Sequence, residues 1–449
     1  MSPVHGADLL LRGRRVVTPE GMREASIHVA DGRIERVAPY DDVPAGREVV
    51  EAGGLVVLPG LVDTHVHVNE PGRTQWEGFA PATRAAAAGG VTTILDMPLN
   101  SIPPTTTPDA LRQKREAAEG ACRVDVGFWG GAIPMYLGLL AGLHAEGVFG
   151  FKAFLCPSGV DEFPSLDLAQ LRSAMEEIAA FDGLLIVHAE LPGPIDEARE
   201  RLANADPFAY STYLASRPAE AEKDAIAAVV QAAAETGCRA HVLHLSAATA
   251  LPLLRDAPRV SVETCPHYLT FAAEEIEAGR TDHKCAPPVR DSVNRERLWD
   301  GLLDGTIRAV VSDHSPCPPD LKGGSFFDAW GGIASLQLGL RAVWTGARAR
   351  GCSIEDVARW MSAGPAALAG LERKGAIAEG RDADLVLFDP EASGLCDPGE
   401  LHHRSAVTPY AWRPLDGRVA ATYLRGQEIY ANGTLREPPA GILLTRDSA

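Results

Sequence analysis

The chain has 449 residues, of which 46% are hydrophobic, and it carries a formal net charge of −18 at pH 7. A protein with this excess of negative charge lacks the basic surface that nucleic-acid-binding proteins use, and it is not attracted to anionic membranes. The length is sufficient for a (β/α) barrel of roughly 250 residues together with a second, smaller unit. We therefore expect a large globular protein with no nucleic-acid partner and no membrane partner.

Eight cysteines are scattered along the chain without a C-x-x-C pair. A disulfide framework is unusual in so large a chain, and we expect reduced thiols in a cytoplasmic protein. The N-terminal stretch MSPVHGADLLLRGRRVV lacks the apolar segment of a secretory signal peptide. No apolar run is long enough to span a bilayer. The cysteines are Cys122, Cys156, Cys238, Cys265, Cys285, Cys317, Cys352 and Cys396.

Both ends of the chain have the pattern of short strands separated by turns. Residues 7–58 alternate apolar and polar residues around Asp31-Gly32, a pair typical of tight hairpins. The same pattern returns in DADLVLFDP and GRVAATYLRGQEIYANGTL, with turn residues at Gly426 and Asn432-Gly433. Two strand-rich ends that flank a different middle predict one small β domain built from both termini.

The middle of the chain alternates apolar runs with Ala-rich helical segments. Eight such runs, rich in β-branched residues and separated by helices, predict a parallel (β/α)8 barrel. An open doubly wound sheet is the alternative, and the count of eight favours the barrel. The strand candidates are 61–67, 91–98, 124–130, 148–155, 184–190, 240–246, 260–266 and 307–313, and the clearest helix candidates are 75–88, 108–119, 165–180, 217–236 and 291–303.

Five of these runs end in a metal-ligand residue type or a lysine, at the strand ends where barrel enzymes place their active sites. The residues are His65, His67, Lys152, His188, His244 and Asp313. His65 and His67 are two residues apart on a strand, so both side chains point to the same side. Each histidine alone has an ordinary explanation as a core residue, and we interpret His241 in that way. Together, the four strand-end histidines and the aspartate indicate a site for Zn²⁺ or a similar divalent ion.

Lys152 is the only charged residue in the run VFGFKAFL. A buried lysine is costly and readily loses its proton. Three interpretations are open, namely a buried ion pair, a Schiff-base lysine, or a neutral amine that takes up CO₂ to form a carbamate. A carbamate has two oxygens and can bridge two metal ions. The spacing alone does not distinguish these interpretations.

The order of these residues resembles that of the cyclic amidohydrolases, the family of dihydroorotases, dihydropyrimidinases (hydantoinases) and allantoinases. The resemblance covers almost the whole chain, and KGAIAEGRDADLVLFDP is similar to the point where the family returns from its barrel to a β-sandwich. It implies a metal-dependent hydrolase barrel over residues 58–375 and a small β-sandwich domain formed by residues 1–57 and 376–449.

The resemblance also implies a role for each of the six residues. His65 and His67 would bind the more buried of two divalent ions, and His188 and His244 would bind the second. Lys152, carboxylated by CO₂, would bridge both ions. Asp313 would bind the first ion and act as general base. Zinc is the expected metal, with cobalt or manganese as alternatives, and a homotetramer is the expected assembly.

Several segments resemble allantoinases in particular, and DTHVHVNEPGRTQWEGF at 63–79 is the most specific of them. Dihydroorotases usually have an arginine where this chain has Asn69, and that arginine binds a substrate carboxylate, which allantoin lacks. The tyrosine that hydantoinases usually have after the bridging lysine is missing from KAFLCPSG. The serine that they tend to have before a Pro-Pro pair is Ala286 here. The other similar segments are 96–106, 263–271, 284–290, 312–319 and 330–337.

The implied reaction is the hydrolytic opening of the hydantoin ring of (S)-allantoin to allantoate, in purine degradation, by a hydroxide held between the two metals. Asn69, Ser315 and Gly332 are candidate substrate contacts, and the Gly/Pro-rich stretch 314–332 is a candidate lid. The alternatives are a hydantoinase or dihydropyrimidinase and, from another class, a non-catalytic dihydropyrimidinase-like scaffold. All six ligand positions are filled, which disfavours the scaffold.

Overall fold

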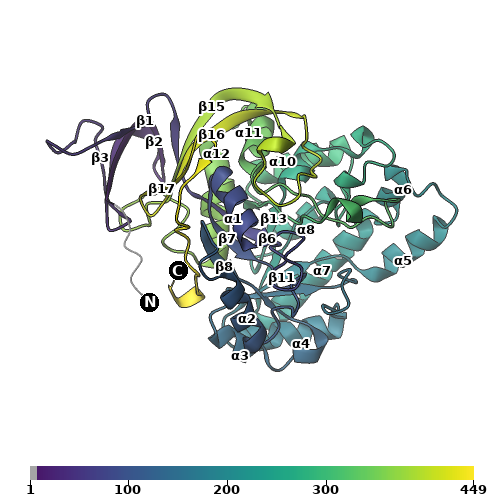
Figure 1. The fold of residues 1–449 in the computed structure, drawn as a ribbon. Coiled ribbons are helices and arrows are strands. Elements are labelled where there is room, and N and C mark those ends of the chain that lie inside the picture. Colours follow the sequence, from purple (N-terminus) through teal and green to yellow (C-terminus); the bar gives the residue numbers. More distant parts are fainter. Residues whose placement is uncertain (1–7, 449) are drawn as a thin grey trace.

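The computed structural model of the protein describes residues 8–448, so the first seven residues of the N-terminal stretch discussed above lie outside the described part. The chain forms a barrel and a smaller sheet domain, in which the purple N-terminal strands lie beside the yellow-green C-terminal strands (Figure 1). This arrangement confirms the predicted fold class, an α/β protein with a (β/α)8 barrel and a small β-sandwich domain built from both termini.

Each of the eight predicted strand runs contains one strand of the barrel. These strands are β6 (Leu61–Val66), β7 (Val91–Asp96), β8 (Asp125–Phe128), β10 (Phe151–Phe154), β11 (Leu184–His188), β12 (Arg239–Val242), β13 (Val260–Thr264) and β14 (Ala309–Val310), with a short β9 (Gly130–Gly131) after β8. Parallel ladders join β6 to β8 and β9 to β14. The circle closes through a parallel bridge between Val66 and His314 and through the N–H of His67, which donates to the carbonyl of His314 at 2.8 Å. The doubly wound alternative is therefore wrong.

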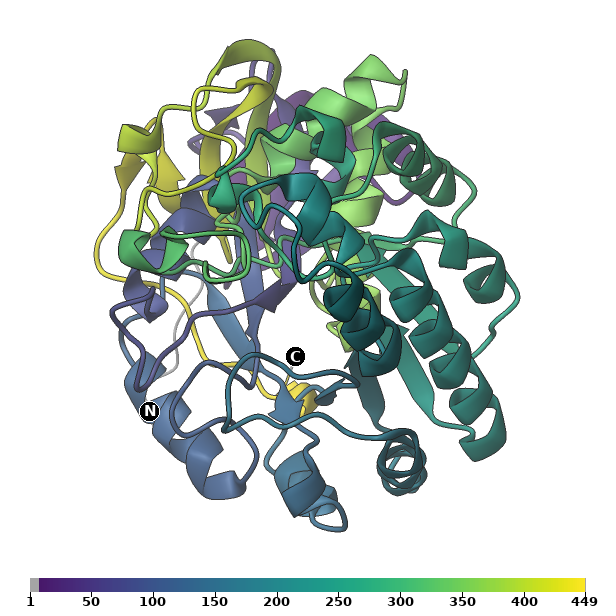
Figure 2. The ribbon, with the colours of Figure 1, turned by 90° about the vertical axis from the view of Figure 1, so that its right-hand side faces the viewer.

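Helices form a ring around the barrel strands (Figure 2). They are α1 (Phe79–Ala88), α2 (Pro108–Ala118), α3 (Leu140–Ala145), α4 (Leu168–Ala179), α5 (Pro192–Arg201), α6 (Tyr210–Ala215), α7 (Ala219–Thr236), α8 (Leu251–Arg255), α9 (Pro266–Thr270), α10 (Ser292–Leu303), α11 (Gly339–Ala349), α12 (Ile354–Ala358) and α13 (Gly364–Ala369). The five helix candidates are confirmed as α1, α2, α4, α7 and α10. Local sequence explains some of their ends, since Thr107 caps α2 and Asp167 forms a capping box with Gln170 at the start of α4.

The sheet domain is one nine-stranded sheet that folds around its own core. Its strands are β1 (Leu9–Thr18), β2 (Gly21–Ala30), β3 (Arg33–Ala38), β4 (Val50–Glu51), β5 (Val56–Pro59), β15 (Leu385–Leu395), β16 (Pro414–Leu424), β17 (Gln427–Ala431) and β18 (Thr434–Leu435). β5 joins the two ends of the chain, because it pairs with β1 on one side and with β15 on the other. Leu11 and Ile27 from the N-terminal strands pack in one cluster with Leu385 and Tyr423 from the C-terminal strands.

The predicted turns of this domain are confirmed. Asp31 and Gly32 connect β2 to β3 with φ angles of 49° and 76°. Asn432 and Gly433, with φ angles of 46° and 86°, connect β17 to β18. Positive φ at both positions produces a backbone twist that matches the twist of the paired strands, and asparagine, aspartate and glycine adopt it most readily.

A buried ion cluster joins the sheet domain to the barrel at the N-terminal ends of the barrel strands. Nζ of Lys374 lies 2.7 Å from Asp125, 2.9 Å from Asp382 and 2.8 Å from Asp384. Arg425 forms a second ion pair with Asp125 at 2.5 Å. The three carboxylates lie close enough together to suggest a metal site, but the two cations already satisfy them. We therefore assign this cluster to domain packing.

All eight cysteines are free and buried. Within residues 8–448, none of the helices combines the length and the apolar character needed to cross a membrane.

Candidate metal centre and active site

The six predicted ligand residues lie in one buried cluster at the C-terminal ends of the barrel strands. They are His65, His67, Lys152, His188, His244 and Asp313. Oδ1 of Asp313 lies 3.1 Å from Nε2 of His65 and 3.5 Å from Nε2 of His67. The ring of His244 lies 5.3 Å from the ring of His65 and 4.6 Å from the ring of His188, measured between centroids. Residues that are up to 248 positions apart in the sequence thus meet at one point.

The donor atoms of this cluster suit a divalent ion. One ligand atom each from His65, His244 and Asp313 lie within 4.8 Å of one another. Nδ1 of His244 is buried and has no hydrogen-bond partner among the described residues. Burial lowers the pKa of His67 to about 3 and holds the pKa of His244 well below its usual value. Both imidazoles are therefore neutral near pH 7, which is the form that binds metals.

Lys152 is buried in this cluster without a carboxylate partner. Its Nζ lies 3.5 Å from Nε2 of His65 and 4.9 Å from the ring centroid of Phe154. Within residues 8–448, no carboxylate oxygen lies within ion-pair distance of this amine, so the buried ion pair considered from the sequence is wrong. Burial lowers the pKa of Lys152 to about 8. A neutral amine is therefore accessible near physiological pH.

Asp313 is held as a carboxylate. Burial alone raises the pKa of Asp313, but the charge of His65 and hydrogen bonds from His65 and His67 outweigh burial and hold the pKa well below its usual range. The backbone of Asp313 has a φ of 44°, and that of His244 has a φ of 39°. Positive φ is uncommon outside glycine, although aspartate and histidine tolerate it better than most residues, and strained backbone of this kind gathers at functional sites.

Two buried glutamates that the sequence analysis missed orient the histidines. Oε1 of Glu263 lies 2.7 Å from Nδ1 of His65, and its Oε2 lies 3.0 Å from Nε2 of His241. Oε2 of Glu190 lies 2.7 Å from Nε2 of His188. Each carboxylate fixes which ring nitrogen of its histidine faces the cluster. The signal that could have revealed Glu263 is the one used for Lys152, namely a single charge near the end of an apolar run.

The cluster opens into a cavity of about 430 Å³. Five of the six ligand residues line it, namely His67, Lys152, His188, His244 and Asp313. The other lining residues are Leu99, Asn100, Phe154, Pro157, Ser158, Gly159, Arg199, Tyr213, Arg217, Lys284, Cys285, Ala286, Ser315, Phe327, Asp328, Ala329, Trp330, Gly331 and Gly332. A cavity of this size accepts a small-molecule substrate beside the metal-ligand residues.

The candidate substrate contacts differ in their position relative to this cavity. Ser315 and Gly332 line it, and a Cβ added at Gly332 would lie 2.3 Å from the carbonyl oxygen of Ser315, which explains the glycine. Asn69 is buried outside the described lining, where its side chain donates to the carbonyl of Pro316 at 3.4 Å. Asn100 lines the cavity instead, and its Nδ2 lies 3.4 Å from Nδ1 of His67.

The stretch 314–332 forms a wall of the cavity. It contains a short 3₁₀ helix, Pro319–Lys322, and its residues 327–332 line the cavity. Trp330 packs against Trp76 at a ring-centroid distance of 4.8 Å. The segment considered as a lid thus lines the cavity in the described structure.

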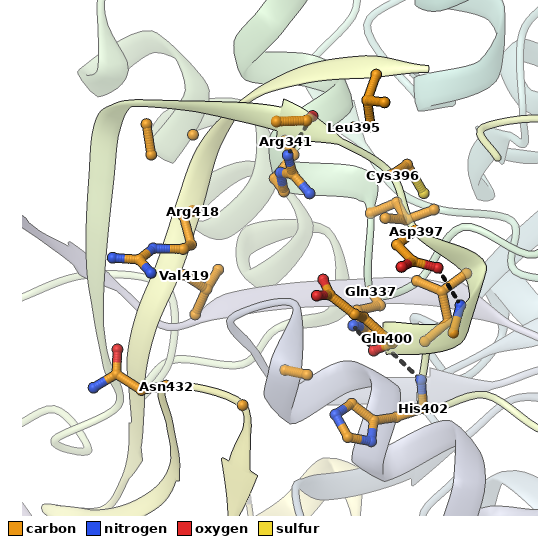
Figure 3. Close-up of a pocket in the computed structure, with 18 of the residues that line it drawn as sticks. Gln337, Arg341, Leu395, Cys396, Asp397, Glu400, His402, Arg418, Val419 and Asn432 are labelled. Atoms are coloured by element: carbon orange, nitrogen blue, oxygen red, sulfur yellow. Dashed lines mark hydrogen bonds between the residues drawn. The ribbon is translucent and has the colours of Figure 1, made fainter. Parts of the chain in front are cut away.

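A second cavity, of about 600 Å³, lies between the sheet domain and α11 (Figure 3). Gln337 crosses it, donating to the carbonyl of Glu400 at 3.0 Å and accepting from the N–H of His402 at 2.8 Å. Arg341 donates to backbone carbonyls of β15 and β16. The side chains of this second cavity thus tie the two domains together, and the six ligand residues all lie elsewhere.

Comparison with known proteins agrees with this geometry. The model of the amidohydrolase family matches residues 56–429. The chain is 55% identical to an allantoinase of Streptomyces avermitilis, with 98% of this chain and 99% of the relative aligned. It is 40% identical to an allantoinase of Arabidopsis thaliana over 96% of this chain and 90% of the relative. Among solved structures, an L-hydantoinase (dihydropyrimidinase) from Arthrobacter aurescens superposes with a TM-score of 0.92, at 32% identity, over 98% of this chain and 99% of that one.

These relatives and the strand-end cluster point to the same chemistry. The family is metal-dependent, and the cluster of histidines and carboxylates supplies metal ligands at the end of the barrel where substrates bind. The chain therefore belongs to the amidohydrolase family, within its allantoinase group, and is a hydrolase that acts on the C–N bonds of cyclic amides.

Proposed function

We propose that this protein opens the hydantoin ring of (S)-allantoin by hydrolysis and releases allantoate. The observation that carries the proposal is the 55% identity to an allantoinase over nearly the full length of both chains. The six ligand residues lie together beside a cavity of suitable size, which supports a catalytic role over the role of a non-catalytic scaffold.

Two divalent ions, with zinc as the preferred metal, would be held by the six residues of the cluster. His65 and His67 would bind one ion together with Asp313, and His188 and His244 would bind the other. Lys152 would carry a CO₂-derived carbamate between them, which its unpaired, easily deprotonated amine favours. When bound, such ions polarise a carbonyl group and lower the pKa of water toward neutrality.

Asp313 is the residue that moves the proton. Its carboxylate takes a proton from the attacking water as the oxygen adds to the ring carbonyl carbon, and returns it to the ring nitrogen as the C–N bond breaks. Asp313 lies beside His65 and His67 and also lines the cavity in which the substrate would bind. Glu263 and Glu190 hold His65 and His188 in the orientation that this geometry needs.

Ser315 and Gly332 are the proposed backbone contacts for the polar edge of the ring. Both line the cavity, and the N–H of Ser315 donates to the carbonyl of Ile333 at 3.1 Å, which leaves the carbonyl of Ser315 for the substrate. The carbonyl of Gly332 already accepts from Lys322 and has one lone pair left for a second donor. Asn69 supports this wall through its contact with Pro316.

Hydantoin hydrolysis is the second candidate activity. The observation in its favour is the close superposition on an L-hydantoinase from Arthrobacter aurescens. The identity to that hydantoinase is 32%, whereas the identity to the Streptomyces avermitilis allantoinase is 55%, so we prefer allantoin hydrolysis as the activity.

Turnover measured on a panel of allantoin, hydantoin, dihydrouracil and dihydroorotate tests the proposal. We expect kcat/KM for allantoin to exceed the values for the other three substrates. If kcat/KM is highest for hydantoin or dihydrouracil, that compound and not allantoin is the substrate. If the metal-loaded protein turns over none of the four compounds, the proposal is wrong.

Three further points extend the proposal. The free, buried cysteines are compatible with a cytoplasmic protein. A homotetramer is the assembly proposed from the family. The proposed domain limits are 1–57 and 376–449 for the β-sandwich and 58–375 for the barrel.

A further inference from the structure

Two lysines hold the loop that forms one wall of the active-site cavity. Lys284 donates from Nζ to the carbonyl of Ala329. Lys322 donates to the carbonyl of Trp330 at 2.9 Å and to that of Gly332 at 2.5 Å. Of the two, Lys284 also lines the cavity, whereas Lys322 is outside the described lining. Lys284 is therefore in a position to touch a bound substrate, and Lys322 only holds the loop.

Lys284 has a hydrogen-bond donor to spare. An ammonium group has three N–H donors, whereas the described acceptors are the carbonyl of Ala329 and, at 3.5 Å, that of Phe327. Burial and the positive charges of Lys322 and Arg217 lower the pKa of Lys284 to about 8, and the negative charge of Asp328 offsets only part of this shift. An acceptor carried by the substrate would meet this unsatisfied donor.

The lining contains three other lysine or arginine side chains, Lys152, Arg199 and Arg217, of which Lys152 belongs to the metal-ligand cluster. Arg217 donates twice to Glu190, at 3.0 and 2.5 Å, so its guanidinium is committed to that carboxylate. Arg199 lies in the exposed last turn of α5. Among the described residues of the lining, Lys284 is thus the half-buried cation with a donor free to face the cavity.

We propose that Lys284 donates a hydrogen bond to the carbonyl oxygen of a ureido substituent on the hydantoin ring, and so selects substrates that carry this group. The inference rests on the proposed function, since allantoin differs from hydantoin by one –NH–CO–NH₂ substituent on the ring. Hydantoin offers no acceptor at that position. One hydrogen bond from a charged donor changes binding by roughly 10- to 100-fold.

The test compares Lys284→Met with Lys322→Met, each carrying its metals, on two ligands. The KM and kcat for allantoin and the competitive inhibition constant of hydantoin are measured for both variants and for the parent. We expect Lys284→Met to raise KM for allantoin, or to lower kcat/KM, by roughly 10- to 100-fold. The inhibition constant of hydantoin should change by no more than about threefold, because hydantoin lacks the ureido group. Lys284→Arg, which keeps a charged donor, should recover part of the loss.

Lys322→Met is the matched control, because it removes an anchor of the same loop without removing a residue of the lining. It should affect allantoin and hydantoin to a similar extent. If Lys284→Met also weakens both ligands equally, Lys284 is only a loop anchor and the proposal is wrong. If the parent protein binds or hydrolyses hydantoin but does not hydrolyse allantoin, the proposed function is wrong. The proposed selection for a ureido group is then wrong as well.

Discussion

The Nδ1 atom of His65 lies 2.7 Å from Oε1 of Glu263, and both side chains are fully buried. The second oxygen of the same carboxylate holds His241 at 3.0 Å. Glu263 thereby directs Nε2 of His65 toward Asp313. Orienting carboxylates of this kind commonly change metal affinity by about 10- to 100-fold.

The substitution Glu263→Gln should therefore weaken metal binding by roughly 10- to 100-fold, because an amide holds the imidazole less firmly than a carboxylate. Metal affinity is measured by competition with a chromogenic chelator, independently of activity. Asp384→Asn is the control, since it alters a buried carboxylate at the opposite end of the barrel. An unchanged affinity in Glu263→Gln would limit Glu263 to packing.

The metal content of the purified protein is the second prediction. The six clustered ligand residues lead us to expect two divalent ions per chain, with zinc preferred. Dialysis against a chelator should abolish turnover, and zinc, cobalt or manganese should restore it. Elemental analysis that finds fewer than one ion per chain, in protein purified without chelators, would contradict a dinuclear centre.

Lys152→Ala should lose most of the bound metal and most of the activity, because it removes the proposed bridging carbamate. A short carboxylic acid added to this variant should restore part of both, since its two oxygens can take the place of the carbamate. Metal content and turnover are measured on the same preparation with and without the acid. A fully active Lys152→Ala or Lys152→Arg protein would rule out the bridge.

Asp313→Asn should retain substantial metal and lose at least a factor of roughly 10²–10⁴ in kcat, which is the contribution of general acid–base catalysis. Asparagine keeps an oxygen that can coordinate but removes the basic carboxylate. If Asp313 only caps the turn that follows it, the substitution should cost about 1 kcal/mol of stability or less and leave turnover intact. Measuring kcat together with bound metal separates these outcomes.

The lowered pKa of Lys284 has a consequence for stability. The pKa of Lys284 falls from the ordinary lysine value of 10.5 to about 8 in the fold, so between these pH values the unfolded chain binds more protons than the folded chain. The contribution of Lys284 to the free energy of unfolding therefore rises as the pH increases from about 8 to about 10.5. Because the side chain is partly exposed, the increase is at most about 3 kcal/mol.

The comparison with Lys284→Met isolates that effect. The melting temperature of the parent, relative to that of the variant at the same scan rate, should increase between pH 7.5 and pH 10. A difference that stays constant with pH would mean that the charge of Lys284 is not destabilised by burial.

Much of this protein follows from its sequence. Apolar runs that alternate with Ala-rich segments determined the barrel, because strands buried on both faces and amphipathic helices leave different patterns. Paired turn residues such as Asp31-Gly32 determined the hairpins of the sheet domain. The metal-ligand residues could be found because polar residues at the ends of apolar strands, such as Lys152, have few structural explanations.

Only the tertiary structure decided how these residues act together. Glu263 is 198 positions from His65 in the sequence, and nothing local to either residue indicates their hydrogen bond. Lys284 lines the cavity because a loop about 45 positions further along the chain folds back onto its ammonium group. The hydrophobic pattern and the succession of strands along the chain can be read locally from the sequence. The partner of a buried charge depends instead on packing across the whole barrel.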